Sequence, residues 1–238
     1  MSLHLSEPAR FAPVPPPEQP ANRAFISVPA PRSGADIPWL TRALATAVVA
    51  HDRVLVVLES ELASYERCAT PHQVLPRLQL AEEAELVAEH TMAGWHQVDA
   101  VRRQLPYRDG TRVHIAAWTH FVDSNFATLW RHLLAAFAVT SAFRQDVLEL
   151  GHAALREGRI LPGALHAERM ARAACFREVE SLAMRLRVAE TAGYCHEYGP
   201  LNDGMLAQRL YDNAYAADGL TVESTLGQPA QRVYHHLP

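Results

Sequence analysis

Lysine is absent from this sequence of 238 residues, and all 22 cationic side chains are arginine. The absence excludes a phosphate-binding loop of the GxxxxGK[ST] type, and it also excludes a Schiff-base lysine, a pyridoxal phosphate anchor and a kinase-type lysine. Positive charge is scarce overall, since the formal net charge is −4 at pH 7. Without a global basic field, a nucleic-acid partner would need a local arginine patch.

Cysteine is scarce too, and Cys68, Cys175 and Cys195 show no CxxC spacing. This pattern argues against a disulfide framework and against a cysteine-based zinc site, and it favours buried free thiols. No apolar run reaches the length that spans a bilayer, and the N-terminal segment lacks the apolar stretch typical of a signal peptide. We therefore expect a cytoplasmic protein with no membrane partner.

Proline is concentrated in residues 1–22, which hold few apolar side chains. Such a composition predicts a disordered or polyproline arm, so we assign the fold to residues 23–238. The length of 238 residues, with 49% apolar and 20% charged side chains, is typical of one globular domain.

Apolar strands and helical patterns alternate along the first half of the chain. Residues 24–29, 53–58 and 112–118 are predicted strands, and residues 36–50 and 74–104 are predicted helices. This alternation favours parallel pairing with right-handed crossovers. Residues 125–198 are mostly helical in pattern, with breaks near Thr140 and at 161–163; a short helix near 203–215 and a strand-like ending at 232–235 follow. The sequence thus predicts an α/β, Rossmann-like parallel sheet with a large helical C-terminal half.

Polar residues follow the first two predicted strands. The first strand leads into a Pro/Ser/Gly turn with Arg32 and Ser33, and Glu59 and Glu61 stand at the end of the second. Open α/β sheets bind ligands beyond the carboxyl ends of their strands, so we expect a pocket here. A carboxylate in it would suit a cationic group such as an arginyl side chain, because guanidinium and carboxylate pair through two hydrogen bonds. A surface or capping role for the two glutamates is the alternative.

Tyr194 and Glu197 lie three residues apart in a segment with helical periodicity. On a helix this spacing places both side chains on one face. Gly199-Pro200 would end that helix directly afterwards. A phenol and a carboxylate presented together can orient an amine and move a proton, as acyl transfer requires. The alternative is a tyrosine at the edge of the core beside a solvated glutamate.

The order of these elements and several short motifs resemble the tRNA-dependent cyclodipeptide synthases. The resemblance covers about residues 23–236 and rests on the segments 23–29, 53–58, 113–118, 143–147, 194–200 and 233–235. It implies a fold similar to the catalytic domain of class I aminoacyl-tRNA synthetases. It also implies an enzyme that joins two aminoacyl groups from aminoacyl-tRNAs into a diketopiperazine, through an aminoacyl-serine and without ATP or another cofactor. The implied partner is aminoacyl-tRNA rather than DNA.

The first motif of the family is altered here. Ser27 occupies its glycine position, Pro29 its nucleophilic serine position and Arg32 its asparagine position. Proline cannot form an acyl ester. Either Ser27 or Ser33 therefore replaces the nucleophile, or the amine of one aminoacyl group attacks the other ester directly. Ordinary strand and turn roles are the alternative for both serines.

The resemblance implies further roles. Tyr194 would orient the amine and Glu197 would move protons, although their spacing is three residues here and four in the family. Arg32 would face the tRNA or the substrate carbonyl. Tyr234 and His235 would line the aminoacyl pocket, and an ordinary alternating strand is the other interpretation of that pair.

The family grips tRNA with a basic helix after the second strand, but the matching helix here is rich in glutamate. Neutralisation of phosphates dominates nucleic-acid affinity, so an acidic helix disfavours that docking mode. A substitute face could be built from arginines that would otherwise be solvated helix surface: Arg144, Arg156, Arg159, Arg169, Arg172, Arg177, Arg185 and Arg187.

Two other functions fit parts of the sequence. A non-catalytic aminoacyl or tRNA binder of the same fold would be consistent with Pro29. A helical di-iron oxygenase would use the ExxH pair Glu149 and His152 together with glutamates near residues 82–89. The chain has one such pair where a di-iron bundle needs two, and the strands before Gly110 do not suit a bundle.

Overall fold

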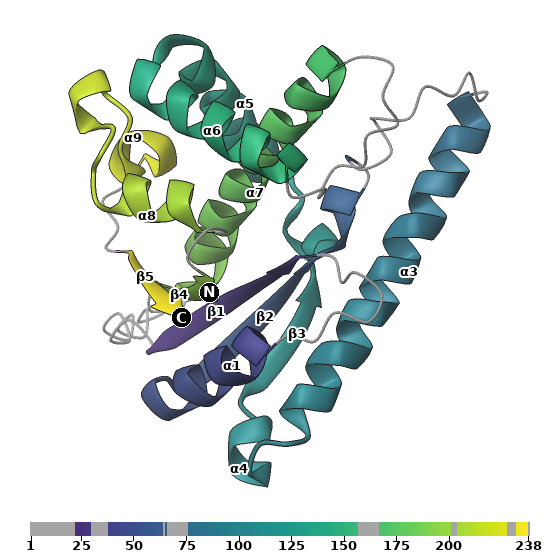
Figure 1. The fold of residues 1–238 in the computed structure, drawn as a ribbon. Helices are drawn as coiled ribbons and strands as arrows, with labels where there is room; N and C mark the ends of the chain where they lie inside the picture. The colour runs from purple at the N-terminus through teal and green to yellow at the C-terminus, as the bar shows by residue number, and fades with distance from the viewer. Residues whose placement is uncertain are drawn as a thin grey trace, which may run out of the picture.

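The computed structural model describes residues 22–29, 38–63, 65, 76–156, 167–200, 204–227 and 232–237. In these residues five strands form one sheet in the order β3-β2-β1-β4-β5, and every pairing is parallel (Figure 1). The strands are β1 Arg23–Pro29, β2 Arg53–Glu59, β3 Val113–Ala117, β4 His196–Pro200 and β5 Val233–Leu237. The predicted parallel α/β architecture is confirmed, and the first three strands lie where the sequence placed them.

The helices are α1 Pro38–Ala50, α3 Pro76–Arg102, α4 Tyr107–Gly110, α5 Ser124–Val139, α6 Ser141–Arg156, α7 Ala167–Ala192, α8 Met205–Tyr211 and α9 Val222–Leu226. Short 3-10 segments cover η1 Ser60–Ala63, η2 Trp118–Phe121 and η3 Ala216–Asp218. Across the described ranges, no helix has by itself the length and apolar composition needed to cross a membrane, whereas α5 and the first part of α6 meet that test as a pair bent by 102°.

Each face of the sheet has its own core. On one face Ala24, Ile26 and Val28 of β1 pack with the buried side of α1 and with Val98 of α3. On the other face Phe25 packs with a larger cluster from α5, α6, α7 and α8. Alternate residues of a strand point to opposite faces, which explains this division. Figure 1 shows α1 and α3 beside the strands, with α5, α6, α8 and α9 gathered around α7.

The predicted helix through residue 198 is wrong at its C-terminal end. α7 stops at Ala192, and Gly193 has a φ of 65°, the left-handed conformation common just past a helix. The chain then enters β4, which is hydrogen-bonded between β1 and β5. The prediction used Gly199-Pro200 as the end of the helix, whereas Gly193 is the glycine that ends it.

The connection before β3 holds the short helix α4, and Thr111 caps it through backbone hydrogen bonds. The predicted break near Thr140 is confirmed, because α5 ends at Val139 and α6 begins at Ser141.

Candidate active site

Two buried carboxylates stand on the α7 face of the sheet. Glu59 is the last residue of β2, and Glu197 is the second residue of β4; they are 2% and 0% exposed. The sheet register pairs Glu59 with Pro29 and Glu197 with Phe25. Residues 25 and 29 of β1 point to the same face, so both carboxylates do as well.

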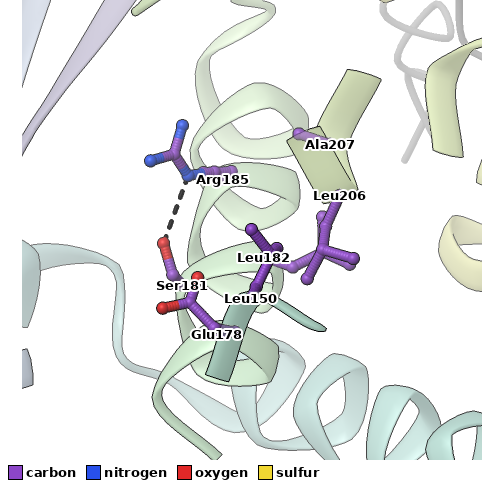
Figure 2. A pocket seen from close by; sticks show the side chains of 7 residues that line it. All are labelled: Leu150, Glu178, Ser181, Leu182, Arg185, Leu206 and Ala207. Atoms are coloured by element: carbon purple, nitrogen blue, oxygen red, sulfur yellow. Dashed lines mark hydrogen bonds between the residues drawn. The ribbon is translucent and has the colours of Figure 1, made fainter. Parts of the chain in front are cut away.

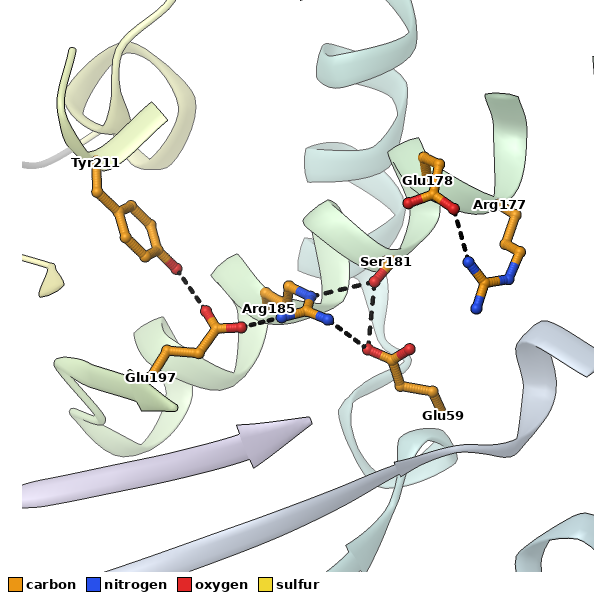
Figure 3. A network of polar contacts seen from close by, with 7 residues as sticks. All are labelled: Glu59, Arg177, Glu178, Ser181, Arg185, Glu197 and Tyr211. Carbon is orange, nitrogen blue, oxygen red and sulfur yellow. Dashed lines mark hydrogen bonds and ion pairs between the residues drawn. The ribbon is translucent and has the colours of Figure 1, made fainter. Parts of the chain in front are cut away.

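Arg185 of α7 joins these two carboxylates. Its Nη2 lies 3.2 Å from Oε1 of Glu59, and its Nη1 donates to Oε1 of Glu197 (Figure 3). Ser181, one turn earlier on α7, donates to Oε1 of Glu59 at 3.2 Å and accepts from Nε of Arg185. One guanidinium is thus shared by two carboxylates, so when both are ionised this group of three carries one more negative than positive charge.

Tyr211 of α8 completes the contacts to Glu197. Its hydroxyl donates to Oε2 of Glu197 at 3.2 Å (Figure 3). Burial raises the pKa of Glu197, against the opposing effect of Arg185. Burial and then the charge of Glu197 raise the pKa of Tyr211 well above its ordinary value. A buried carboxyl whose pKa is raised is better suited to take and return a proton than an exposed one.

A small cavity adjoins this network. It is lined by Leu150, Glu178, Ser181, Leu182, Arg185, Leu206 and Ala207, and its volume of about 10 Å³ is close to what one water molecule needs (Figure 2). Glu178, one of its lining residues, pairs with Arg177 at 2.6 Å (Figure 3). The cavity formed by the described residues is therefore a water-sized hollow, much smaller than an aminoacyl group.

Ser27 lies on the same face as the two carboxylates. It pairs in register with Val57 of β2, and on β1 it lies two residues after Phe25 and two residues before Pro29. With strands about 4.8 Å apart and about 3.3 Å between residues, its Cα lies roughly 8 Å from those of Glu59 and Glu197. Ser27 is buried beneath the helical layer. Ser27 therefore lies on the same sheet face as Glu197.

Tyr194 does not share a helix face with Glu197, because it follows the end of α7 and Glu197 lies in β4. Its side chain belongs to the α7-side core. Burial raises the pKa of the Tyr194 phenol, and the positive charges of Arg23 and Arg53 partly offset this effect. Arg23 and Arg53 are register partners at the start of β1 and β2. Tyr194 therefore lies near the amino-terminal end of the sheet, and the phenol that contacts Glu197 belongs to Tyr211.

Tyr234 and His235 face opposite sides of the sheet. Tyr234 pairs in register with Glu197, and its ring lies so close to Gly199 and Gly204 that a Cβ there would be 2.3 Å and 1.8 Å from ring or hydroxyl atoms. Neither position leaves room for a larger residue. His235 points to the α1 face, where its ring stacks on Tyr198 at 4.4 Å between centroids. Successive strand residues alternate, so this pair does not line one pocket together as predicted.

His235 belongs to a histidine cluster with His51 and His196. Nδ1 of His196 lies 3.0 Å from Nε2 of His235, and Nε2 of His51 lies 2.9 Å from the hydroxyl of Tyr198. Burial, then repulsion by the other two rings, lowers the pKa of His51 to about 4. Burial also lowers the pKa of His196 and of His235.

The remaining predicted residues fall into three groups. Arg32 and Ser33 lie outside the described residues, as does the side chain of Glu61. Two arginines of the substitute face, Arg185 and Arg187, are buried and are therefore not solvated surface. Arg187 forms ion pairs with Asp123 and Glu190. In the alternative di-iron reading, Glu149 and His152 of α6 are exposed.

Comparison with known proteins bears on the fold. No protein-family model and no curated protein matches the chain. Three solved structures are similar to this chain in fold. AlbC, a cyclodipeptide synthase from Streptomyces noursei, has a TM-score of 0.62 at 13% identity, over 92% of this chain and 96% of that one. A cyclodipeptide synthase from Candidatus Glomeribacter gigasporarum, bound to Phe-tRNAPhe, has a TM-score of 0.55 at 14% identity, over 83% and 84%.

The third is a Mycobacterium tuberculosis protein whose structure relates cyclodipeptide synthetases to type I tRNA synthetases. Its TM-score is 0.56 at 12% identity, over 79% of this chain and 78% of that one. The chain therefore has the Rossmann-like fold that cyclodipeptide synthases share with those synthetases. At identities this low, the structural similarity shows the fold and not the activity.

Proposed function

We propose that this protein is an aminoacyl transferase that uses aminoacyl-tRNAs to form a cyclic dipeptide or a related amide. The observation that supports it is the buried network of Glu59, Arg185, Glu197 and Tyr211 on the same sheet face as Ser27. It occurs in a fold similar to cyclodipeptide synthases, one of which was solved with Phe-tRNAPhe.

The network can hold and deprotonate an amine. Glu197 accepts hydrogen bonds from Arg185 and Tyr211, and burial raises its pKa. An α-ammonium group would offset the excess negative charge of the two carboxylates. Loss of its proton to Glu197 would then leave an amine able to attack an ester. Here Tyr211 takes the orienting role that the sequence assigned to Tyr194.

Ser27 is the proposed covalent site. Its Oγ would attack the ester carbonyl of the first aminoacyl-tRNA, the bond to the ribose oxygen would break, and the serine proton would pass to that oxygen. The amine of the second aminoacyl-tRNA would attack the acyl-serine and restore the hydroxyl. Attack by the first amine on the second ester would close the ring and release the second tRNA. Pro29 stands at the family's nucleophile position, and Ser27 faces the same side because it is two residues earlier.

The route without a covalent intermediate needs the same amine site. The amine of one aminoacyl group would attack the ester of the other, with Glu197 taking the proton and the pocket supplying proximity. Ser33 remains the second candidate for a covalent role, and Arg32 the residue proposed to face the tRNA or the substrate carbonyl.

The activity is tested by incubating the protein with a panel of charged tRNAs and searching for diketopiperazines by mass spectrometry. We expect a product whose yield falls by about 10²–10⁴-fold in Glu197→Gln, because the proton acceptor is removed. Glu149→Gln on the exposed side of α6 is the matched control and should keep full yield. No cyclic or linear amide with any charged tRNA would overturn the proposal.

The covalent route is tested by trapping. A labelled aminoacyl group should stay on the protein after denaturation, and Ser27→Ala should remove the label. Retention in Ser27→Ala with loss in Ser33→Ala would move the nucleophile to Ser33. Product formation in the double variant would favour direct attack.

The proposed substrate includes a cationic side chain at Glu59. Arg185 and Ser181 both contact its Oε1, so an arginyl guanidinium would join a carboxylate that already binds one guanidinium. Arginyl-tRNA therefore belongs in the panel. A preference for it that Glu59→Gln removes would support this part, and equal use of neutral aminoacyl-tRNAs would exclude it.

A non-catalytic aminoacyl-tRNA binder is the second candidate. Pro29 at the nucleophile position favours it. Binding of charged tRNA in preference to uncharged tRNA, with no amide product, would identify this function.

A further inference from the structure

Three imidazole rings from distant parts of the chain meet on the α1 face of the sheet. His51 follows α1, His196 begins β4 and His235 lies in the edge strand β5. One ring nitrogen from each lies within 4.8 Å of the other two. This cluster is separate from the Glu59–Arg185–Glu197 network, because His196 and His235 point to the opposite side of the strands that carry Glu197 and Tyr234.

The spacing of the rings is close to that of a metal site. Zinc binds imidazole nitrogen at about 2.0–2.1 Å, so two ligands of a tetrahedral ion lie roughly 3.3 Å apart. Nδ1 of His196 and Nε2 of His235 are 3.0 Å apart. The ring of His51 has its centroid 4.6 Å from that of His196. In the ion-free chain one of these two nitrogens carries the proton that they share, so that ring would take its other tautomer when the nitrogen binds an ion.

The contacts of His51 fix which of its nitrogens is available. Nδ2 of Asn22 donates to the carbonyl of Ala50 at 2.6 Å, so the other amide atom, Oδ1, faces Nδ1 of His51 at 2.6 Å. An oxygen accepts only, so Nδ1 must carry the proton, and Nε2 presents a lone pair toward the cluster. Metal-binding histidines are commonly oriented by such a carbonyl on the far nitrogen.

Tyr198 and the exposure of the rings supply the rest of the site. The Tyr198 hydroxyl donates to the Nε2 lone pair of His51 at 2.9 Å, so an ion that binds Nε2 would replace this hydrogen bond and leave the hydroxyl oxygen beside it. His51 is buried, whereas His196 and His235 are partly exposed, so solvent reaches the cluster on the side of His196 and His235. Three neutral nitrogens with one open position suit a late first-row divalent ion.

We propose that His51, His196 and His235 bind one Zn²⁺ ion per chain. The ion links the end of α1 to β4 and to the edge strand β5, three segments that are far apart in sequence. An ion that binds the folded chain and not the unfolded one stabilises the folded state by mass action. The proposal is independent of the aminoacyl transfer activity.

The experiment is a titration of the full chain, freed of metal with a chelator, with Zn²⁺ in a calorimeter. We expect one ion per chain, and at least tenfold weaker binding in His51→Gln, His196→Gln and His235→Gln. Asn22→Ala should weaken binding by about 10–100-fold, because it removes the group that orients His51. Co²⁺ should give the visible absorption of a tetrahedral complex with the original chain and not with the histidine variants.

His236→Gln is the matched control, because His236 is an exposed histidine of the same strand that points to the other face and contacts Gln208. It should bind Zn²⁺ as the original chain does. Circular dichroism identifies a variant that fails to fold, and Asn22→Ala then carries the test because it keeps all three rings. No binding to the original chain, or binding that Asn22→Ala and the histidine variants leave unchanged, would overturn the proposal.

Discussion

The two faces of the sheet bury polar groups in different ways. On the α7 face, Glu59 and Glu197 share the buried guanidinium of Arg185. On the α1 face, burial lowers the pKa of His51 and His196, so their rings enter the folded protein without charge. A buried charge needs an opposite charge, whereas an imidazole can release its proton instead. The two faces should therefore respond differently to mutation and to acid.

The largest effect should come from Arg185→Met. The substitution leaves two buried carboxylates without their shared cation, and we expect the free energy of unfolding to fall by about 3–5 kcal/mol. Urea denaturation measures it. Arg131→Gln on the exposed side of α5 is the control and should change stability by less than about 0.5 kcal/mol. Equal losses in the two variants would show that the network does not depend on Arg185.

Gly204→Ala should destabilise the same face by about 2 kcal/mol, because the new Cβ would lie 1.8 Å from Cζ of Tyr234 and force the ring to move. Thermal or urea unfolding would measure the loss. Tyr234→Leu removes the ring atoms that clash, so Gly204→Ala should cost much less in that background. An equal cost in both backgrounds would show that Tyr234 is not the obstacle.

Acid should weaken the α1 face. The pKa of His51 is about 4 in the folded protein and 6.5 when unperturbed, so the unfolded chain binds more protons between these values. This contribution to stability is complete above about pH 6.5 and is lost as the pH falls toward 4. Neighbouring His196 and His235 act in the same direction as burial, and Asp52 opposes it. His51 is buried but its neighbours His196 and His235 are partly exposed, so we expect a loss on the order of 1–2 kcal/mol.

The raised pKa of Glu197 has the opposite effect on stability as the pH falls, because the folded state takes up that proton at a higher pH than the unfolded chain does. Unfolding of the original chain and of His51→Gln, both with chelator, should be compared from pH 7 to pH 4. The difference between them isolates His51. A difference that does not change with pH would contradict the assignment of a lowered pKa.

The smallest effect should come from Tyr198→Phe, which removes the hydroxyl bonded to His51 and keeps the ring stacked on His235. We expect a loss of about 1 kcal/mol in urea unfolding. Tyr107→Phe is a suitable control, because that side chain is 89% exposed. Identical stability of both variants would show that the hydroxyl contributes nothing.

The fold was largely predictable because β1, β2 and β3 are apolar runs bounded by turns and separated by helices. β4 was not predictable in this way. Its residues His196, Glu197 and Tyr198 continue a helical pattern. They form a strand because Gly193 ends the helix in a left-handed conformation and because the segment pairs with β1 and β5. Local patterns cannot report pairing between distant segments.

The candidate site was predictable in part. Glu59, Glu197 and Ser27 were candidates from the sequence, and the register places them on one face. Tyr211 and Arg185 were missed as partners of Glu197, since a tyrosine in a short helix and an arginine in a long one form no motif with a strand residue. Arg185 was assigned to a surface, yet it is 4% exposed.

The sequence by itself determined the alternation of strands and helices and, through the absence of lysine, the chemistry that this chain cannot perform. Only the tertiary structure decided which phenol meets Glu197, where the guanidinium of Arg185 lies, and that His51, His196 and His235 meet at all. The physical reason is that periodicity records the face on which a residue lies within its own element. The partner across the interior depends on how whole elements pack, and that information is spread over the entire chain.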